Sequence, residues 1–158
     1  MANFFIEIGT SDFNTLEYLA ENGWKGIFVE PVKELLDNLK RYDGCIYENC
    51  AISSKRGSTT IKYYDPNWAT GWIRGVGSID MGMNIMNSNP NWKEHECTRK
   101  VKIMTLDDLI KKHNVKEIEY LKIDTEGEEY NILHSYSWSI KPEQLNIEYK
   151  HWHNRFIS

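Results

Sequence analysis

Three apolar segments of this sequence each have a residue with a carboxylate side chain at their end. Glu7 lies at the end of the first segment, Glu30 at the end of the second and Asp124 at the end of the third. Because the carboxyl ends of parallel strands meet at the crevice where open α/β sheets bind ligands, we expect these side chains to converge. Converging carboxylates suit a polyhydroxylated or a cationic small molecule. The spacing therefore predicts one ligand site at one edge of a sheet.

The turn after the first segment indicates which kind of ligand to expect. It reads Glu-Ile-Gly-Thr-Ser and holds one glycine, whereas a dinucleotide pyrophosphate needs a glycine-rich turn. Glu30 follows about twenty residues later, the position from which an acid binds two ribose hydroxyls. We therefore expect a cofactor that contains a nucleoside. The alternative is that Glu30 only supplies a favourable charge to the start of the helix after Pro31.

The order of apolar and amphipathic stretches predicts an α/β fold. Strands are expected at residues 4–8, 26–29, 45–52, 58–64, 99–104, 121–123 and 144–149, and helices at 14–22, 31–39, 105–110 and 128–134. Strands that alternate with helices are typical of a parallel sheet with right-handed crossovers. We therefore predict one domain over residues 1–158, with a doubly wound, mostly parallel sheet that is flanked by helices. The alternating stretches 58–64 and 99–104 are expected to pair with each other.

A long segment, residues 66–97, separates those two stretches. It is rich in glycine and in aromatic residues, so it is too irregular for the core and too aromatic for a passive linker. We expect it to contact the substrate, with Trp72 stacking on a flat ring or a sugar face and Arg74 holding an anionic group. Ser78 is a further candidate. The alternative is an ordinary surface loop tethered by its tryptophans.

Length, charge and cysteine content exclude several classes of protein. With 158 residues and a net charge of -4, the chain has no clustered basic surface for nucleic acid. No apolar run is long enough to span a bilayer, and the first residues lack the order of a signal peptide. Three unpaired cysteines suit neither a disulfide framework nor a zinc site. We expect a cytoplasmic protein with no nucleic-acid or membrane partner.

Five sequence blocks in the same order resemble FkbM-type methyltransferases. The blocks are Ile6 to Gly9, Val29 to Pro31, Asn49 to Ser53, Thr105 to Leu109 and Leu121 to Gly127. The resemblance runs from about Phe4 to His151, and its most specific part lies between Thr105 and Gly127. It implies a Rossmann-like fold and a methyltransferase that depends on S-adenosylmethionine. It also implies an oxygen of a small molecule or glycan as the methyl acceptor.

The resemblance also implies roles for individual residues. The cofactor would be bound by Glu7, Gly9, Thr10, Ser11, Asp12, Glu30, Pro31, Ala51, Ile52 and Asp124. Within this set, Glu30 would hold the ribose hydroxyls, Ala51 and Ile52 would line the adenine, and Asp124 would lie beside the sulfonium. Carboxylates suit the positive charges of a sulfonium and an ammonium, which agrees with the separate argument from charge. Phe13 stands where family members usually carry a small residue.

A hydroxyl acceptor needs a base to take its proton. The candidates are Asp124, Glu126, Glu148 and His151, which would all fall at or just beyond the ends of adjacent strands. Glu126 could instead supply a favourable negative charge to the start of the following helix. Glu148 could contact the substrate. His151 and His153 with Glu148 could hold a metal, but histidines near a chain end are more often solvated, so we predict no metal.

The last predicted strand ends close to the end of the sequence. FkbM-like proteins normally continue with a further helix and closing antiparallel strands, so we expect either a compact variant or a shortened segment. In both cases the exposed sheet edge could be covered by a second copy of the chain. A non-catalytic subunit that binds S-adenosylmethionine is the alternative function. A nicotinamide oxidoreductase is disfavoured by the missing glycine pattern.

Overall fold

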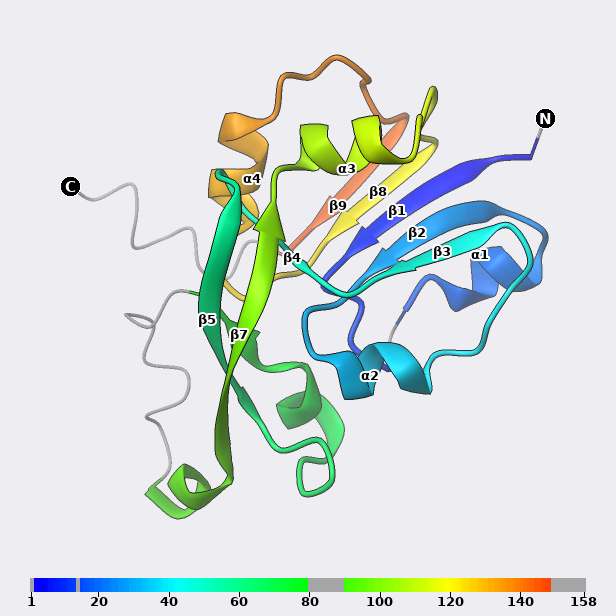
Figure 1. The fold of residues 1–158 in the computed structure, drawn as a ribbon. Helices are drawn as coiled ribbons and strands as arrows, with labels where there is room; N and C mark the ends of the chain where they lie inside the picture. The colour runs from blue at the N-terminus through cyan, green and yellow to red at the C-terminus, as the bar shows by residue number, and fades with distance from the viewer. Residues whose placement is uncertain (1, 14, 80–89, 149–158) are drawn as a thin grey trace.

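The computed structural model describes residues 2–13, 15–79 and 90–148. These residues include two sheets and four α-helices, and Figure 1 shows the helices on both faces of the larger sheet. No helix in the described ranges is long and apolar enough to cross a membrane.

The larger sheet has five strands. They are β1 (Phe4–Ile8), β2 (Lys25–Val29), β3 (Cys45–Glu48), β8 (Tyr120–Ile123) and β9 (Gln144–Ile147). Their spatial order is β3-β2-β1-β8-β9, and every neighbouring pair is parallel. β1 and β2 are nearly continuous apolar runs because each is covered on both faces. The carboxyl ends of β1, β2 and β8 therefore lie side by side at one edge, as the sequence predicted.

Helices cover both faces of this sheet. The helices are α1 (Glu17–Glu21), α2 (Lys33–Asn38), α3 (Leu106–Lys112) and α4 (Glu129–Ser135). Alternate residues of β1 point to opposite faces, so Phe5 packs with Leu16 and Leu36 of the α1 and α2 side. Ile6 packs with Leu109 of α3 and Ile132 of α4 on the other side. This arrangement confirms the predicted α/β fold with a parallel sheet between helices.

The smaller sheet has four strands. They are β4 (Ala51–Ile52), β5 (Gly57–Tyr64), β6 (Gly77–Ser78) and β7 (Glu96–Met104), in the order β4-β7-β5-β6. β5 and β7 are antiparallel, which confirms the predicted pairing of residues 58–64 with 99–104. Ile61 and Val101 of this sheet pack against Val32 and Leu35 at the start of α2. The smaller sheet therefore borders the same edge at which the strands of the larger sheet end.

The prediction of one strand over residues 45–52 is wrong. β3 belongs to the larger sheet and β4 to the smaller one, with Asn49 and Cys50 between them. The Asn49 side-chain amide donates to the carbonyl oxygens of Glu30 and Pro31, at 2.9 and 3.0 Å. These bonds hold the chain at the end of β2 while it passes from one sheet to the other.

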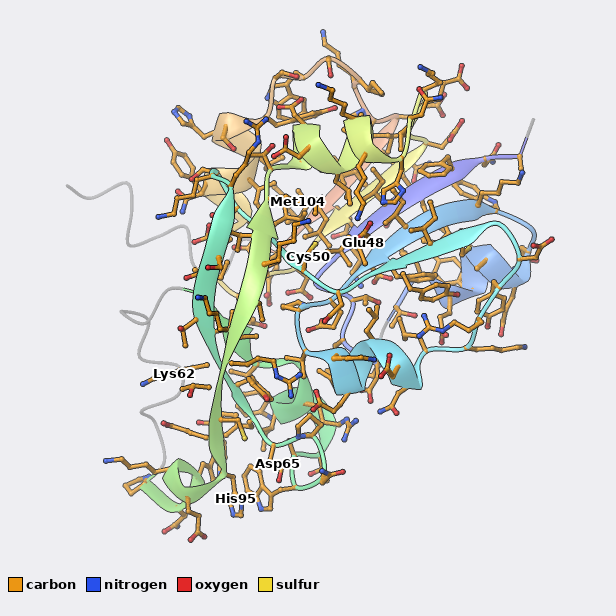
Figure 2. All side chains as sticks on the ribbon, viewed as in Figure 1. Glu48, Cys50, Lys62, Asp65, His95 and Met104 are labelled. Atoms are coloured by element: carbon orange, nitrogen blue, oxygen red, sulfur yellow. The ribbon has the colours of Figure 1, made fainter. Side chains whose placement is uncertain are left out.

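Part of the segment between residues 66 and 97 is regular. It contains the 3-10 helices η1 (Gly71–Gly75) and η3 (Pro90–His95), with β6 between them, while residues 80–89 lie outside the described part. Trp68 stacks on His95 with ring centroids 4.0 Å apart. Figure 2 shows Asp65 and His95 together at the far end of β5 and β7, where the Asp65 amide donates to the His95 carbonyl at 2.9 Å. The described parts of this segment, residues 66–79 and 90–97, are therefore packed and contain short regular elements.

Candidate ligand and catalytic site

A cavity opens where the carboxyl ends of β1, β2 and β8 meet η1 and the smaller sheet. Seven of the predicted site residues line it, namely Gly9, Glu30, Pro31, Ala51, Ile52, Arg74 and Asp124. Its empty volume is about 550 Å³ with the open mouth included, and its interior is narrow in this conformation.

Gly9 brings two strand ends into contact at the floor of the cavity. Its amide donates to the Val29 carbonyl at 2.9 Å, and the Asp124 amide donates to the Ile8 carbonyl at 2.9 Å. Gly9 has a φ of 79°, and a Cβ atom at this position would lie 1.9 Å from the Asp124 carbonyl oxygen. Only glycine can therefore fill this position without moving β1 or β8.

Glu30 is a buried acid in the cavity wall, with 6% of its surface exposed. Its two carboxylate oxygens accept from the backbone amides of Ser11, at 2.7 Å, and Val32, at 2.9 Å. Burial raises the pKa of Glu30 to about 7, against the lowering effect of the Val32 and Ser11 amides. Each carboxylate oxygen has a second lone pair, so Glu30 can still accept hydrogen bonds from a ligand.

Glu7 lies near the end of β1 and is fully buried. One of its oxygens accepts from Lys122 Nζ at 3.0 Å, and the other accepts from Thr10 Oγ1 at 3.1 Å and the Leu16 amide at 2.9 Å. Burial raises the pKa of Glu7, and Lys122 opposes that effect. Glu7 does not line the cavity, so the geometry supports a role in holding the turn after β1. The predicted contact of Glu7 and Thr10 with a cofactor remains a prediction.

The turn after β1 also holds η1 in place. Asp12 forms an ion pair with Arg74, and the same guanidinium donates to the Pro66 carbonyl. The pKa of Asp12 is lowered because hydrogen bonds from Arg74 and Asn38 outweigh its burial. Arg74 lies in the cavity wall, but its guanidinium is engaged by Asp12. An anionic substrate would have to compete with that carboxylate.

Ser11 adds a polar group beside the cavity. It has a φ of 53° and is 7% exposed, and its hydroxyl oxygen has no hydrogen-bond partner among the residues that the structure describes. That oxygen lies 3.9 Å from the position of a Cβ atom on Gly75, which lines the cavity. A buried hydroxyl without a partner is costly, so this one is available to a ligand that enters here.

Acidic groups gather at the ends of β8 and β9. Carboxylate oxygens of Asp124, Glu129 and Glu148 lie within 4.8 Å of one another. Burial, the hydrogen bond from Glu148 and the charges of Glu148 and Glu126 together raise the pKa of Asp124, which Lys122 opposes. This spacing could fit a cation, but backbone amides already donate to both carboxylate oxygens of Glu129. We assign no metal to this cluster.

Apolar side chains form the opposite wall of the cavity. Sequence reasoning predicted Ala51 and Ile52 here but missed several others, which are Val29, Val32, Leu35, Ile61, Val76 and Ile79. The apolar face of α2 was visible in the sequence, but its position against the smaller sheet was not. Cys50 also lines the cavity and packs with Met104 where the two sheets meet (Figure 2). Burial raises the pKa of its thiol to about 12, so Cys50 is not a nucleophile.

Three further predicted residues, Trp72, Ser78 and Glu126, do not line the cavity. Trp72 is 61% exposed and meets Trp92 edge to face, with ring centroids 5.8 Å apart. The Ser78 hydroxyl donates to the Glu126 carbonyl at 3.2 Å, which ties β6 to the loop after β8. Glu126 has a φ of 55° in that loop. The predicted base His151, and His153 with it, lie outside the described residues.

Comparison with known proteins gives one match. Residues 1–158 match a family model described as the methyltransferase FkbM domain. This match covers the whole chain and confirms the resemblance that the sequence blocks carry. No curated protein and no solved structure matches the chain.

Proposed function

The chain belongs to the FkbM methyltransferase family, and we propose that it transfers a methyl group from S-adenosylmethionine to a hydroxyl oxygen of a small molecule or glycan. The observation that carries this proposal is the shared cavity of Glu30 and Asp124 at adjacent strand ends. Open α/β sheets bind their ligands at this edge.

The chemistry of the cavity suits this methyl donor. When bound, S-adenosylmethionine supplies a methyl group on a positively charged sulfur. The carboxylates of Glu30 and Asp124 favour positive charge and ribose hydroxyls, and they disfavour the pyrophosphate of a dinucleotide. Ala51, Ile52 and Leu35 offer an apolar surface for a purine ring. The buried hydroxyl of Ser11 provides one more hydrogen-bonding group at the mouth.

The narrow interior implies that the cavity widens on binding. Arg74, Val76 and Ile79 line it from the segment that contains η1 and β6. Within this segment, η1 is held to the turn after β1 by side-chain contacts of Arg74, which can break without unfolding either sheet. We therefore propose that η1 moves outward to admit the cofactor and returns to exclude water.

Asp124 would lie nearest to the reaction. Methyl transfer is an in-line displacement, so the protein mainly aligns the acceptor oxygen with the methyl carbon and keeps water out. Asp124 lines the cavity at the end of the central pair β1 and β8, with Glu148 beside it at the end of β9. Trp72 and Trp92 lie on the segment that we predict to contact the acceptor.

Two measurements test the proposal. Isothermal titration calorimetry should show binding of S-adenosylmethionine and none of the oxidised nicotinamide cofactor. Incubation with a panel of hydroxylated small molecules and glycans should then give acceptor-dependent S-adenosylhomocysteine, detected by mass spectrometry. Binding without product from any acceptor would favour the non-catalytic subunit. Failure to bind S-adenosylmethionine would remove the proposal.

We also place the reaction in the cytoplasm. The described cysteines, Cys45, Cys50 and Cys97, are all free thiols, which suits a reducing compartment. Quantitative localisation of a tagged full-length protein in its native cell tests this placement.

A further inference from the structure

β8 and β9 place two carboxyl groups side by side next to the cavity. Ile123 of β8 lies opposite Ile147 of β9 in the parallel register, and the Glu148 amide donates to the Ile123 carbonyl at 3.2 Å. The following residues, Asp124 and Glu148, therefore leave adjacent strands at the same level. Their carboxylate oxygens lie within 4.8 Å of each other, so a hydrogen bond between the two groups is within reach.

That hydrogen bond requires a proton. An ionised carboxylate can only accept, so two carboxyl groups can bond to each other only when one of them is protonated. One proton is enough for the pair, because the protonated carboxyl group donates to the ionised one and stabilises its negative charge.

The surrounding charges keep this proton on the pair. Glu126 follows on the loop after β8, and Glu129 of α4 lies within 4.8 Å with its oxygens accepting from the Thr125 and Gly127 amides. Lys122 of β8 is the nearby cation, but its ammonium is bonded to Glu7 of β1. The negative surroundings and the partial burial of Asp124 both favour a shared proton.

We propose that the Asp124–Glu148 pair holds one proton in the free protein and releases it when a cationic ligand enters the cavity. This inference rests on the proposed function, since it identifies that cation with the sulfonium of S-adenosylmethionine. A positive charge beside Asp124 stabilises the doubly ionised pair, so binding and proton release are coupled. The pair is thereby converted into a base only when the methyl donor is present.

The same pair then accepts the proton that methyl transfer releases. As the acceptor oxygen bonds to the methyl carbon, the carbon–sulfur bond breaks and its electrons remain on sulfur, which becomes neutral. The hydroxyl proton of the acceptor goes to the pair. The pair thus returns to its singly protonated form just as the neighbouring positive charge disappears. The pair loses one negative charge as it takes up the proton, and sulfur loses its positive charge in the same step. The net charge of the site therefore stays constant.

Calorimetry measures the released proton directly. S-adenosylmethionine is titrated into the full-length protein near pH 7 in two buffers with different ionisation enthalpies, phosphate and Tris. The difference in observed enthalpy gives the number of protons exchanged. We expect release of about 0.5 to 1 proton for each bound molecule, together with affinity that rises by up to about tenfold for each pH unit.

Two comparisons assign the proton to the pair. Glu148→Gln should abolish most of the release, because its amide can donate to Asp124 without a shared proton. Glu143→Gln, a change of an exposed acid shortly before β9, is the matched control and should leave the release unchanged. S-adenosylhomocysteine lacks the sulfonium charge and should release fewer protons from the unaltered protein than S-adenosylmethionine does.

The outcomes separate this inference from the proposed function. Binding of S-adenosylmethionine with no proton release, or with equal release in Glu148→Gln, overturns the shared-proton inference and leaves the methyltransferase proposal intact. Equal release by S-adenosylmethionine and S-adenosylhomocysteine also overturns it, because the sulfonium would then not be the trigger. No binding of either compound overturns the proposed function itself.

Discussion

The carbonyl oxygen of Asp124 lies 1.9 Å from the place where residue 9 would carry a Cβ atom. Gly9 directly follows β1 and Asp124 directly follows β8, and these two strands are parallel neighbours at the centre of the larger sheet. The backbone at these two strand ends is therefore packed too closely for any side chain at residue 9. The cavity floor depends on this contact, because both residues line the cavity.

Replacing Gly9 by alanine should be strongly destabilising. A left-handed φ costs a non-glycine residue about 1 to 2 kcal/mol, and the contact with the Asp124 carbonyl adds to that cost. We expect Gly9→Ala to lower the free energy of unfolding by about 4 kcal/mol or more, measured by urea denaturation. Gly23→Ala is the matched control, since Gly23 has a φ of 84° but open space around it. Equal losses in the two variants would contradict the close approach.

The main features of the fold could be predicted from the sequence because they depend on local patterns. Apolar runs and the residues between them placed the parallel strands, and Thr105 with Asp108 forms the expected capping box at the start of α3. The break between β3 and β4 could not be predicted in this way. It depends on bonds from Asn49 to carbonyls at the end of β2, eighteen and nineteen residues away, which no local pattern reports.

The candidate site was predictable for the same reason, and only in part. Glu30 and Asp124 line one cavity because strand ends converge in any parallel sheet. Glu7 follows the same pattern, yet its side chain turns inward to Lys122, which is 115 residues away and opposite it in the sheet register. Register between distant strands decides whether a carboxylate is a ligand group or a buried structural group.

Glu30→Ala should weaken the binding of S-adenosylmethionine by about 1 to 3 kcal/mol, through two lost hydrogen bonds to ribose hydroxyls. Calorimetry gives the affinity, and a cooperative thermal transition verifies that the variant is folded. Glu34→Ala is the control, because Glu34 lies four residues further along and pairs with Arg99 on the surface. An affinity equal to that of the unaltered protein would remove Glu30 from the cofactor site.

Glu30 should also make stability depend on pH. Burial raises its pKa from an ordinary 4.5 to about 7, so the folded protein holds this proton over a range in which the unfolded chain has lost it. Stability from this group is therefore full below about pH 4.5 and falls as the pH rises towards about 7. Across that interval, the free energy of unfolding of the unaltered protein should fall by about 3 kcal/mol relative to that of Glu30→Gln. Urea denaturation at several pH values measures the difference, and parallel pH curves would contradict the prediction.

Arg74→Ala should loosen η1 without unfolding either sheet. The variant loses the ion pair to Asp12, which holds η1 to the turn after β1. It also loses the bonds to the Pro66 and Ala69 carbonyls, which lie just before η1. We expect faster hydrogen exchange of amides in residues 71–77, by about tenfold, and a loss of about 1 to 3 kcal/mol in stability.

Mass spectrometry of exchanged peptides resolves this segment from the rest of the chain. Arg99→Ala is the matched control, because Arg99 pairs with Glu34 and not with the turn. Exchange in residues 71–77 that is the same in both variants would show that Arg74 does not fasten η1.

Asp124→Asn should lower turnover far more than it lowers cofactor affinity. The amide keeps the size of the side chain but cannot take up the proton of an acceptor hydroxyl, and general-base catalysis typically contributes about 10² to 10⁴-fold in rate. Acceptor-dependent formation of S-adenosylhomocysteine gives the turnover, and calorimetry gives the affinity, which we expect to change by less than about tenfold. Asp43→Asn, on an exposed turn, is the control for a surface change of the same kind. Because the amide removes only the proton-accepting group, a variant with full turnover would exclude Asp124 as the base and leave Glu148 or Glu126 to be tested next.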